Sequence, residues 1–226
     1  MRDQRLTDID VKDLSYPSDI VACERTSQLF VADIGYVWRM STDGENIKHC
    51  LSKPTSDTFK PWTLSVTSTR LLVTLRSTHQ LMHFDEDGDE LRRVQLPDNM
   101  EPRHAVESPT GKFIVATYNT QLVYPEGQVV EVNTGGEVLR QFKGSRLLVI
   151  GRTPHVAVDS HGNIFVADCD NRHILLLNDR LSLRRVIVDE HQLSDERPWR
   201  LCYREDEGQL LVGLDSCFAM FDVLCR

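Results

Sequence analysis

The hydrophobic positions of this chain fall in short runs separated by polar turns, and the order of the runs repeats about every 44 residues. Each repeat begins near a proline and contains a short apolar run, a polar turn and a second run rich in β-branched residues. The second runs occupy residues 29–33, 71–75, 113–117, 164–168 and 210–214. Runs of this length and composition are typical of β-strands, and no long stretch has the 3.6-residue period of a helix. The pattern predicts an all-β protein.

The prolines that open the repeats are separated by 44, 41, 52 and 44 residues. They are Pro17, Pro61, Pro102, Pro154 and Pro198. A third apolar run follows in each repeat, and in four repeats a turn leads to a fourth, more polar run. Glycine-containing pairs at 43–44, 87–88 and 135–136 supply the positive φ angles that tight hairpins need. The fourth runs, such as residues 90–96 and 182–188, alternate apolar and charged residues, which is typical of an edge strand with one face in water.

Four short antiparallel strands within 40 to 45 residues make one blade of a β-propeller. The five repeats therefore predict a five-bladed propeller that forms a single domain over residues 1–226, and six blades with one degenerate or lost is the alternative. The fifth repeat runs out after its third strand, whereas residues 6–14 precede the first repeat and alternate like a strand. We expect residues 6–14 to pair with the last blade and close the ring.

The fourth repeat carries a recognisable signature, Val-Ala-Asp at 166–168 followed by Asn-Arg-His-Ile at 171–174. It is similar to the motif of NHL-repeat propellers, with the arginine and the histidine transposed. Residues 31–33 repeat its first part, and the other three repeats keep only the hydrophobic pattern. The chain thus resembles the C-terminal NHL domain of tripartite-motif proteins. The resemblance implies an interaction platform for a protein partner, with RNA binding as the alternative; the RING and B-box zinc modules of those ubiquitin ligases have no counterpart in this sequence.

Composition and charge narrow the class of protein. The chain is 40% hydrophobic with a formal net charge of −8, so it resembles a soluble domain and not a protein that binds nucleic acid through general basicity. No apolar stretch approaches 18 residues, and the polar N-terminus does not resemble a signal peptide. We expect a cytoplasmic location and no membrane association. The six cysteines contain no Cys-x-x-Cys pair, which predicts reduced thiols and no zinc site.

In a propeller, the start of each innermost strand and the loop between the second and third strands lie on one face. In this chain those positions carry aromatic, basic and amide side chains, a mixture typical of recognition surfaces. The predicted face residues are Trp62, Arg76, Arg103, His104, Tyr118, Asn119, Arg152, His155, Arg172, Trp199 and Arg200. Residues 118–127, which account for the longest spacing, add a loop beside this face. A structural alternative is that Trp62 and Trp199 wedge between blades.

Two carboxylates end strands at equivalent places in the first and fourth repeats. We predict that Asp33 and Asp168 each accept backbone N–H groups of the loop that follows, as structural turn locks, and that Asn171 has the same role.

Catalysis is the third interpretation, because propellers related in shape include metal-dependent lactonases and a peptide-amidating lyase with metal ions at the channel mouth. Such a site needs histidine or carboxylate ligands from several blades. The matching channel positions are predicted to be Asp19, Thr63, His104, Val156 and Arg200, which do not form a ligand set. We therefore predict no catalytic residue, no metal and no cofactor, and a protein that is not an enzyme.

Overall fold

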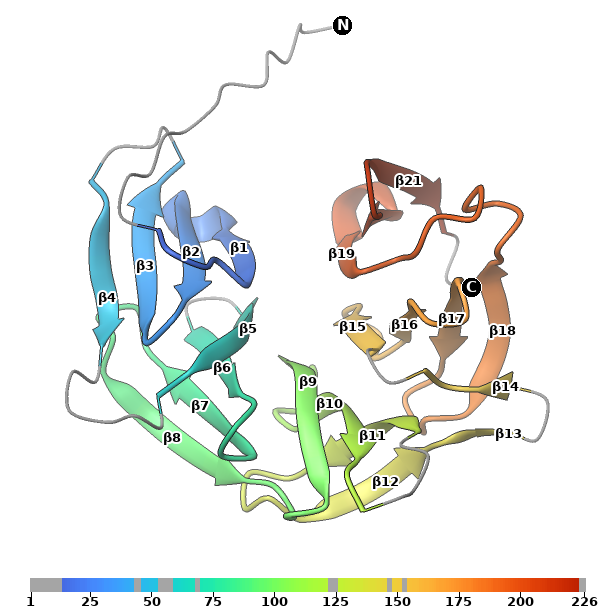
Figure 1. The fold of residues 1–226 in the computed structure, drawn as a ribbon, viewed down its shortest axis with the longest axis horizontal. Coiled ribbons are helices and arrows are strands. Elements are labelled where there is room, and N and C mark those ends of the chain that lie inside the picture. Colours follow the sequence, from blue (N-terminus) through green and yellow to red (C-terminus); the bar gives the residue numbers. More distant parts are fainter. Residues whose placement is uncertain are drawn as a thin grey trace, which may run out of the picture.

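The computed structural model of the chain describes residues 14–42, 46–52, 59–67, 70–121, 126–145, 148–151 and 154–223. In these ranges the regular structure is β-strand, apart from two 3-10 turns of three residues each, η1 (Glu24–Thr26) and η2 (Glu205–Glu207). The sheets are arranged radially around a central channel (Figure 1). The prediction of an all-β propeller with five blades is confirmed. No helix of the described ranges is long and apolar enough to cross a membrane.

The strands of each blade follow one another from the channel outward in chain order. Blade 1 contains β1 (Asp19–Cys23), β2 (Gln28–Asp33), β3 (Tyr36–Ser41) and β4 (Lys48–Ser52). Blade 2 contains β5 (Pro61–Thr67), β6 (Arg70–Leu75), β7 (Gln80–Phe84) and β8 (Glu90–Gln95). Blade 3 contains β9 (Met100–Glu107), β10 (Phe113–Asn119), β11 (Gly127–Val132) and β12 (Val138–Phe142). Blade 4 contains β15 (Pro154–Val158), β16 (Ile164–Asp168), β17 (His173–Leu177) and β18 (Leu183–Val188), and blade 5 contains β19 (Arg200–Arg204), β20 (Gln209–Gly213) and β21 (Phe218–Asp222).

A two-stranded ribbon of β13 (Gly144–Ser145) and β14 (Leu148–Val149) lies in the connection between blades 3 and 4. Blade 5 has three strands in the described part of the chain. The predicted closing strand at residues 6–14 falls, except for Leu14, outside the described residues.

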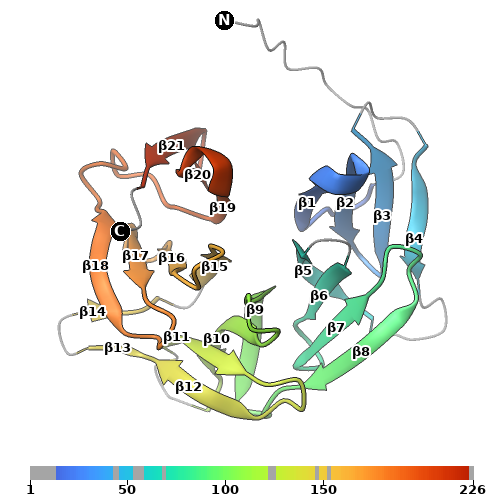
Figure 2. The same ribbon diagram turned by 180° about the vertical axis from the view of Figure 1, so that it is seen from behind.

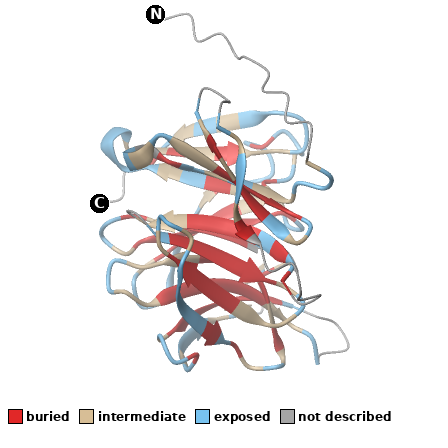
Figure 3. Ribbon diagram, turned by 90° about the vertical axis from the view of Figure 1, so that its left-hand side faces the viewer, coloured by how far each residue is buried: buried red, intermediate tan, exposed pale blue. Residues whose placement is uncertain are grey.

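The second and third strands of blades 2, 3 and 4 are buried on both faces because each of these blades is covered by two neighbours. All five residues of β16 are buried, which explains why the sequence there is an unbroken apolar run and not an alternating one. The outer strand β18 is largely exposed, as its alternating sequence predicts. Buried positions accordingly run along the strands, and exposed ones mark the turns (Figure 3).

Four apolar clusters join successive blades. Blades 1 and 2 meet around Phe30 and Phe84, and blades 2 and 3 meet around Phe113. Blades 3 and 4 meet around Ile164, and blades 4 and 5 meet around Phe165. Within the described residues no such cluster joins blade 5 to blade 1, and the ring is open on that side (Figures 1 and 2).

One hairpin turn shows why its residue must be glycine. Gly136, in the turn between β11 and β12, has a φ of +89°, and a Cβ there would lie 2.1 Å from the backbone oxygen of Gln95 in blade 2. The turn that the sequence predicts at residues 135–136 is thus also a point of close contact between two blades.

Candidate functional site

The innermost strands place one side chain per blade at equivalent positions around the channel. They are equivalent by strand register, because each pairs with a residue near the end of the second strand of its own blade. For example, Asp19 pairs with Ala32, and His155 pairs with Ala167. The five channel residues are Asp19, Thr63, His104, His155 and Arg200. This register corrects the sequence-based assignment of Val156, whose side chain packs in the cluster between blades 3 and 4.

The channel residues bind the backbone of the following blade. The carboxylate of Asp19 accepts the Leu64 N–H at 2.8 Å, and the hydroxyl of Thr63 donates to the Arg103 carbonyl at 2.9 Å. These bonds connect blade 1 to blade 2 and blade 2 to blade 3 at the channel wall.

The two channel histidines continue the same series. Nδ1 of His104 accepts the Val156 N–H at 3.4 Å, and Nδ1 of His155 accepts the Leu201 N–H at 3.3 Å. The two rings stack with their centroids 3.6 Å apart and are 3% and 6% exposed. His104 and His155 therefore line the interior of the molecule and do not lie on the predicted binding face.

Arg200 links the last blade to the first. Its Nε donates to the Asp19 carboxylate at 2.9 Å, and its Nη2 donates to the Ser18 carbonyl at 3.1 Å. Arg200 thus belongs to the channel as well, and the five channel residues form a ring of side-chain contacts that runs from blade to blade.

Both channel histidines are neutral at pH 7. Burial lowers the pKa of His104 to about 4, although the nearby Asp19 carboxylate acts in the opposite direction. Burial also lowers the pKa of His155 well below its ordinary value, and the positive charges that His104 and Arg200 carry when protonated add to this effect.

Asp19, His104 and His155 bring three potential metal-ligand atoms within 4.8 Å of one another. A neutral imidazole, however, has one nitrogen lone pair, and in both histidines Nδ1 uses it to accept a backbone N–H. Nε2 of His104 donates to the Leu64 carbonyl at 3.3 Å, and Arg200 places a positive charge against Asp19. These residues do not fit a metal ion in this arrangement, and their hydrogen bonds give them a structural role at the blade interfaces.

A second cluster, on the loop face of blades 2 and 3, gathers four of the predicted face residues around Glu101. Arg76 and Tyr118 both donate to its carboxylate, and Nη1 of Arg103 lies 3.6 Å from it. Arg103 also lies over the Tyr118 ring at 4.3 Å, and Arg76 over the Trp62 ring at 5.0 Å. Glu101 was not among the residues predicted from the sequence, although it directly precedes the opening Pro102.

The Glu101 cluster keeps its central carboxylate charged. Burial raises the pKa of Glu101, but the hydrogen bonds from Tyr118 and Arg76 and the charge of Arg103 outweigh burial, so this pKa lies below its ordinary value. Asn119 accepts the Gln121 N–H at 2.9 Å and so organises the start of the following loop.

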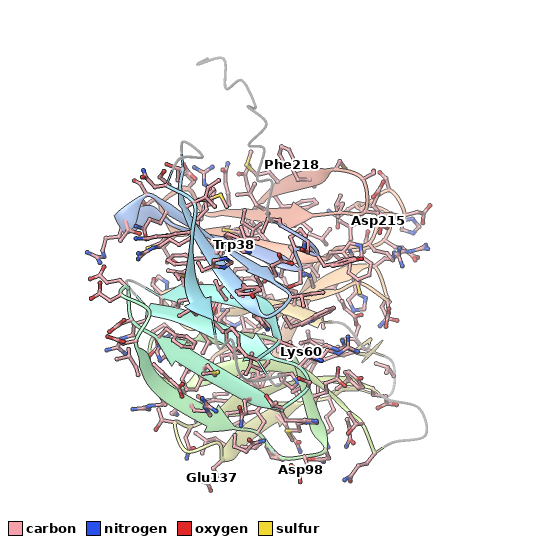
Figure 4. The ribbon with its side chains drawn as sticks, turned by 60° about the vertical axis from the view of Figure 1, so that its left-hand side comes forward. Trp38, Lys60, Asp98, Glu137, Asp215 and Phe218 are labelled. Carbon is pink, nitrogen blue, oxygen red and sulfur yellow. The ribbon has the colours of Figure 1, made fainter. Side chains whose placement is uncertain are left out.

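Beside this cluster, a pocket of about 680 Å³ lies between blades 1 and 2. Its apolar wall is unusually exposed: Tyr16 is 72%, Ile34 58% and Trp62 36% accessible to solvent. Lys60 and Arg76 add positive charge at its rim, and Figure 4 marks Lys60 just before blade 2.

Asp33 holds two residues of this pocket in place. Its carboxylate accepts the backbone N–H groups of Tyr16 at 2.7 Å, Ile34 at 2.8 Å and Ser15 at 2.9 Å. Burial raises the pKa of Asp33, but these three hydrogen bonds outweigh it, so the pKa is lowered and the carboxylate stays charged. The carboxylate fastens the segment that enters blade 1 to the corner between β2 and β3.

Asp168 has the same geometry in blade 4. It accepts the Gly151 N–H at 3.0 Å and the Asn171 side-chain amide at 2.8 Å, and the same amide donates to the Val149 carbonyl at 2.8 Å. Asp168 and Asn171 thus fasten the segment entering blade 4 to the corner between β16 and β17.

The remaining face residues lie on the loops of blades 4 and 5. Asp215 accepts hydrogen bonds from Arg197 at 3.0 Å and from the Trp199 indole at 2.7 Å, which lower the pKa of this carboxyl to about 2. Arg172 pairs with Asp195 at 3.5 Å, and Arg152 lies outside the described residues. The predicted face is therefore divided into the Glu101 cluster, the channel ring and this second loop cluster.

No protein-family model and no curated protein matches the chain. Among solved structures it is similar to virginiamycin B lyase from Staphylococcus aureus in a catalytically inactive form with quinupristin, with a TM-score of 0.65 and 13% identity over 90% of this chain and 64% of the lyase. It is also similar to a nidogen/laminin complex structure, with a TM-score of 0.63 and 14% identity over 82% of this chain and 68% of that one. These likenesses establish the fold. The resemblance to NHL-repeat propellers in particular stays a prediction.

The comparisons contradict the prediction that the chain is not an enzyme, since three of the similar structures are of a streptogramin-type lyase. At 13–14% identity the likeness shows the fold alone, and this fold carries catalysis as well as binding. The chain spans about two thirds of the lyase's length, so the similar propeller is the larger molecule.

Proposed function

We propose that this propeller binds a segment of a partner protein in the pocket between blades 1 and 2. The observation that carries the proposal is the exposure of Tyr16, Ile34 and Trp62 around one depression, since large apolar side chains gathered at a concave site are typical of binding pockets. The role agrees with what the resemblance to NHL-repeat propellers implies.

The chemistry of the pocket selects its ligand. An apolar or aromatic side chain fits against Trp62 and Ile34, and an acidic residue beside it pairs with Lys60. Arg76 is already engaged by Glu101 and by the Trp62 ring, so it stiffens the wall more than it offers a free charge. Asp33 fixes the backbone at Tyr16 and Ile34, and Arg76 lies over the Trp62 ring, so the backbone of the pocket wall loses little conformational entropy when the ligand binds.

The binding test compares three forms of the chain in affinity capture from a cell lysate, each with and without ribonuclease. The forms are the unchanged chain, the double variant Tyr16→Ala/Trp62→Ala, and Leu183→Ala, which removes a 39% exposed side chain on the outer strand of blade 4. We expect specific protein partners that survive ribonuclease, are lost with the double variant and are kept with Leu183→Ala. Capture that ribonuclease abolishes would favour RNA, and capture that the double variant retains would contradict the pocket as the site.

A further inference from the structure

The corner between the second and third strands ends, in three blades, in a residue with a left-handed backbone. His79 comes directly before β7 with a φ of +53°, and Arg172 comes directly before β17 with a φ of +54°. Gly35, at the end of the blade 1 corner, has a φ of +76°. Glycine adopts such angles without steric cost, whereas a residue with a Cβ adopts them at a cost in energy. The fold therefore accepts glycine at this position, and the backbone does not require the side chains at 79 and 172.

These two corner side chains have different surroundings. Arg172 pairs with the exposed carboxylate of Asp195 at 3.5 Å. His79 instead lines the pocket between blades 1 and 2, together with Trp62 and Lys60. A hydrogen bond of 2.9 Å joins its Nδ1 to the Met100 carbonyl at the start of blade 3. The imidazole is thus fixed to blade 3 at the border of a pocket that blades 1 and 2 form.

The hydrogen bond to Met100 sets the chemistry of the other ring nitrogen. A carbonyl oxygen only accepts, so Nδ1 of His79 carries the hydrogen, and in the neutral ring the lone pair lies on Nε2. The channel histidines have the reverse arrangement, because their Nδ1 atoms accept backbone N–H groups. No group in the described part of the chain hydrogen-bonds to Nε2 of His79. This nitrogen is an acceptor that a bound ligand can use.

The two carboxylates of the pocket are already engaged by the protein. Asp33 is 3% exposed and accepts three backbone N–H groups. Glu101 accepts from Arg76 and Tyr118. His79 therefore offers the ligand an acceptor that the protein itself does not use.

We infer that this pocket selects tyrosine or tryptophan over phenylalanine in the partner segment, and that His79 determines this specificity. The inference rests on the proposed function, in which an aromatic ring of the ligand packs on Trp62. The phenol hydroxyl or the indole N–H of that ring donates to Nε2 of His79. Phenylalanine fills the same apolar surface but displaces water from Nε2 without replacing its hydrogen bond. Because His79 is partly exposed, we expect a discrimination of about three- to ten-fold, the usual net value of one hydrogen bond.

The experiment compares two peptides that differ by one hydroxyl group, acetyl-Tyr-Asp-amide and acetyl-Phe-Asp-amide. Each is titrated into the ¹⁵N-labelled full chain at pH 8, so that histidine side chains are neutral. The readout is the NMR signal of the Trp62 indole N–H, which is assigned by its absence in Trp62→Ala. The aspartate of each peptide is the acidic residue that pairs with Lys60. We expect the tyrosine peptide to bind about three- to ten-fold more tightly.

Matched glycine variants assign the discrimination to His79. His79→Gly removes the imidazole at a position whose positive φ suits glycine, and it should bind both peptides with the affinity that the unchanged chain has for the phenylalanine peptide. Arg172→Gly makes the same backbone change at the equivalent corner of blade 4 and should keep the preference for tyrosine. Circular dichroism checks that each variant keeps its β spectrum. The two peptides and the two forms of residue 79 make a thermodynamic cycle that isolates the contact between hydroxyl and imidazole.

The outcomes separate this inference from the proposed function. Equal affinity of the unchanged chain for the two peptides would overturn the inference, and so would a preference for tyrosine that survives in His79→Gly. In both cases the peptides still bind at Trp62, so the pocket stands as a binding site. Binding of neither peptide would overturn the inference as well, whereas lysate capture with Tyr16→Ala/Trp62→Ala decides the proposed function on its own.

Discussion

Blades 4 and 5 have the same strand order and the same cross-strand register, yet they differ sharply in burial. Ile174 in blade 4 is fully buried, and its equivalent in blade 5, Phe218, is 70% exposed. Leu176 and Met220 differ in the same way, at 2% and 54%. The strand pairing is alike in both blades, so the difference in burial has another cause. Blade 5 covers this face of blade 4, whereas no blade of the described residues covers the corresponding face of blade 5. In a propeller, burial is a property of the interface and not of the blade alone.

The corner between the second and third strands differs as well. Blade 4 has Asp168 there, fully buried and bonded to the segment that enters the blade, whereas blade 5 has Leu214. In blade 5 the neighbouring Asp215 instead binds Arg197 and Trp199 at the surface. The carboxylate that fastens the entering segment is thus a feature of blades 1 and 4, and blade 5 is fastened by a more exposed set of bonds.

The largest expected difference between blades 4 and 5 is in the stability lost when equivalent side chains are truncated. Ile174→Ala should lower the free energy of unfolding by about 2–5 kcal/mol, because it removes buried methyl groups and leaves a cavity. Phe218→Ala should change it by less than about 0.5 kcal/mol, because that ring is exposed. Urea unfolding of the two variants measures both values. A large loss for Phe218→Ala would mean that this face of blade 5 is covered in the isolated chain.

The second largest expected effect is a loss of stability at acid pH, which involves the two channel histidines. One of them, His155 of blade 4, accepts the Leu201 N–H of blade 5. The folded-state pKa of His104 is about 4, against 6.5 for the free side chain, and that of His155 is lowered as well. Between these values the unfolded chain binds more protons than the folded one, so the free energy of unfolding falls as the pH drops from about 6.5 to 4, by about 3 kcal/mol for His104 alone.

Urea unfolding across this pH window measures the acid effect. His104→Gln keeps a hydrogen-bond acceptor and removes the titrating group, so its stability should depend less on pH. His161→Gln, which changes an exposed histidine of blade 4, is the matched control. An unchanged pH dependence in His104→Gln would show that the channel histidines do not govern acid sensitivity.

The smallest expected effect concerns the link from blade 5 to blade 1. Arg200→Ala removes the donor to Asp19 and should cost about 1 kcal/mol, since the arginine is partly exposed while the carboxylate is buried. Hydrogen exchange should speed up in β20 and stay unchanged in β16. Arg204→Ala, which breaks an exposed ion pair inside blade 5, should leave exchange in both strands as it is. Equal acceleration in both strands would mean that the two blades open together.

Much of the fold was predictable because a propeller repeats a local pattern. The buried runs at 113–117 and 164–168 coincide with β10 and β16 nearly residue for residue. The candidate site was less predictable, since a one-residue difference in register exchanges Val156 for His155 at the channel. Glu101 was not predicted because its role comes from contacts with Arg76, in the turn after β6, and with Tyr118 on β10, which are distant in the chain.

The sequence by itself determined the number of repeats, the strands within each and the turns that connect them, because these depend on periodicity and local backbone preference. The tertiary structure alone decided which side chains meet. It turned His104, His155 and Arg200 toward the channel, placed Tyr16 and Ile34 beside Trp62, and left one face of blade 5 exposed at Phe218 and Met220. These outcomes depend on how neighbouring sheets are positioned around a common axis, and a contact between blades joins residues too far apart in the chain for any local pattern to encode.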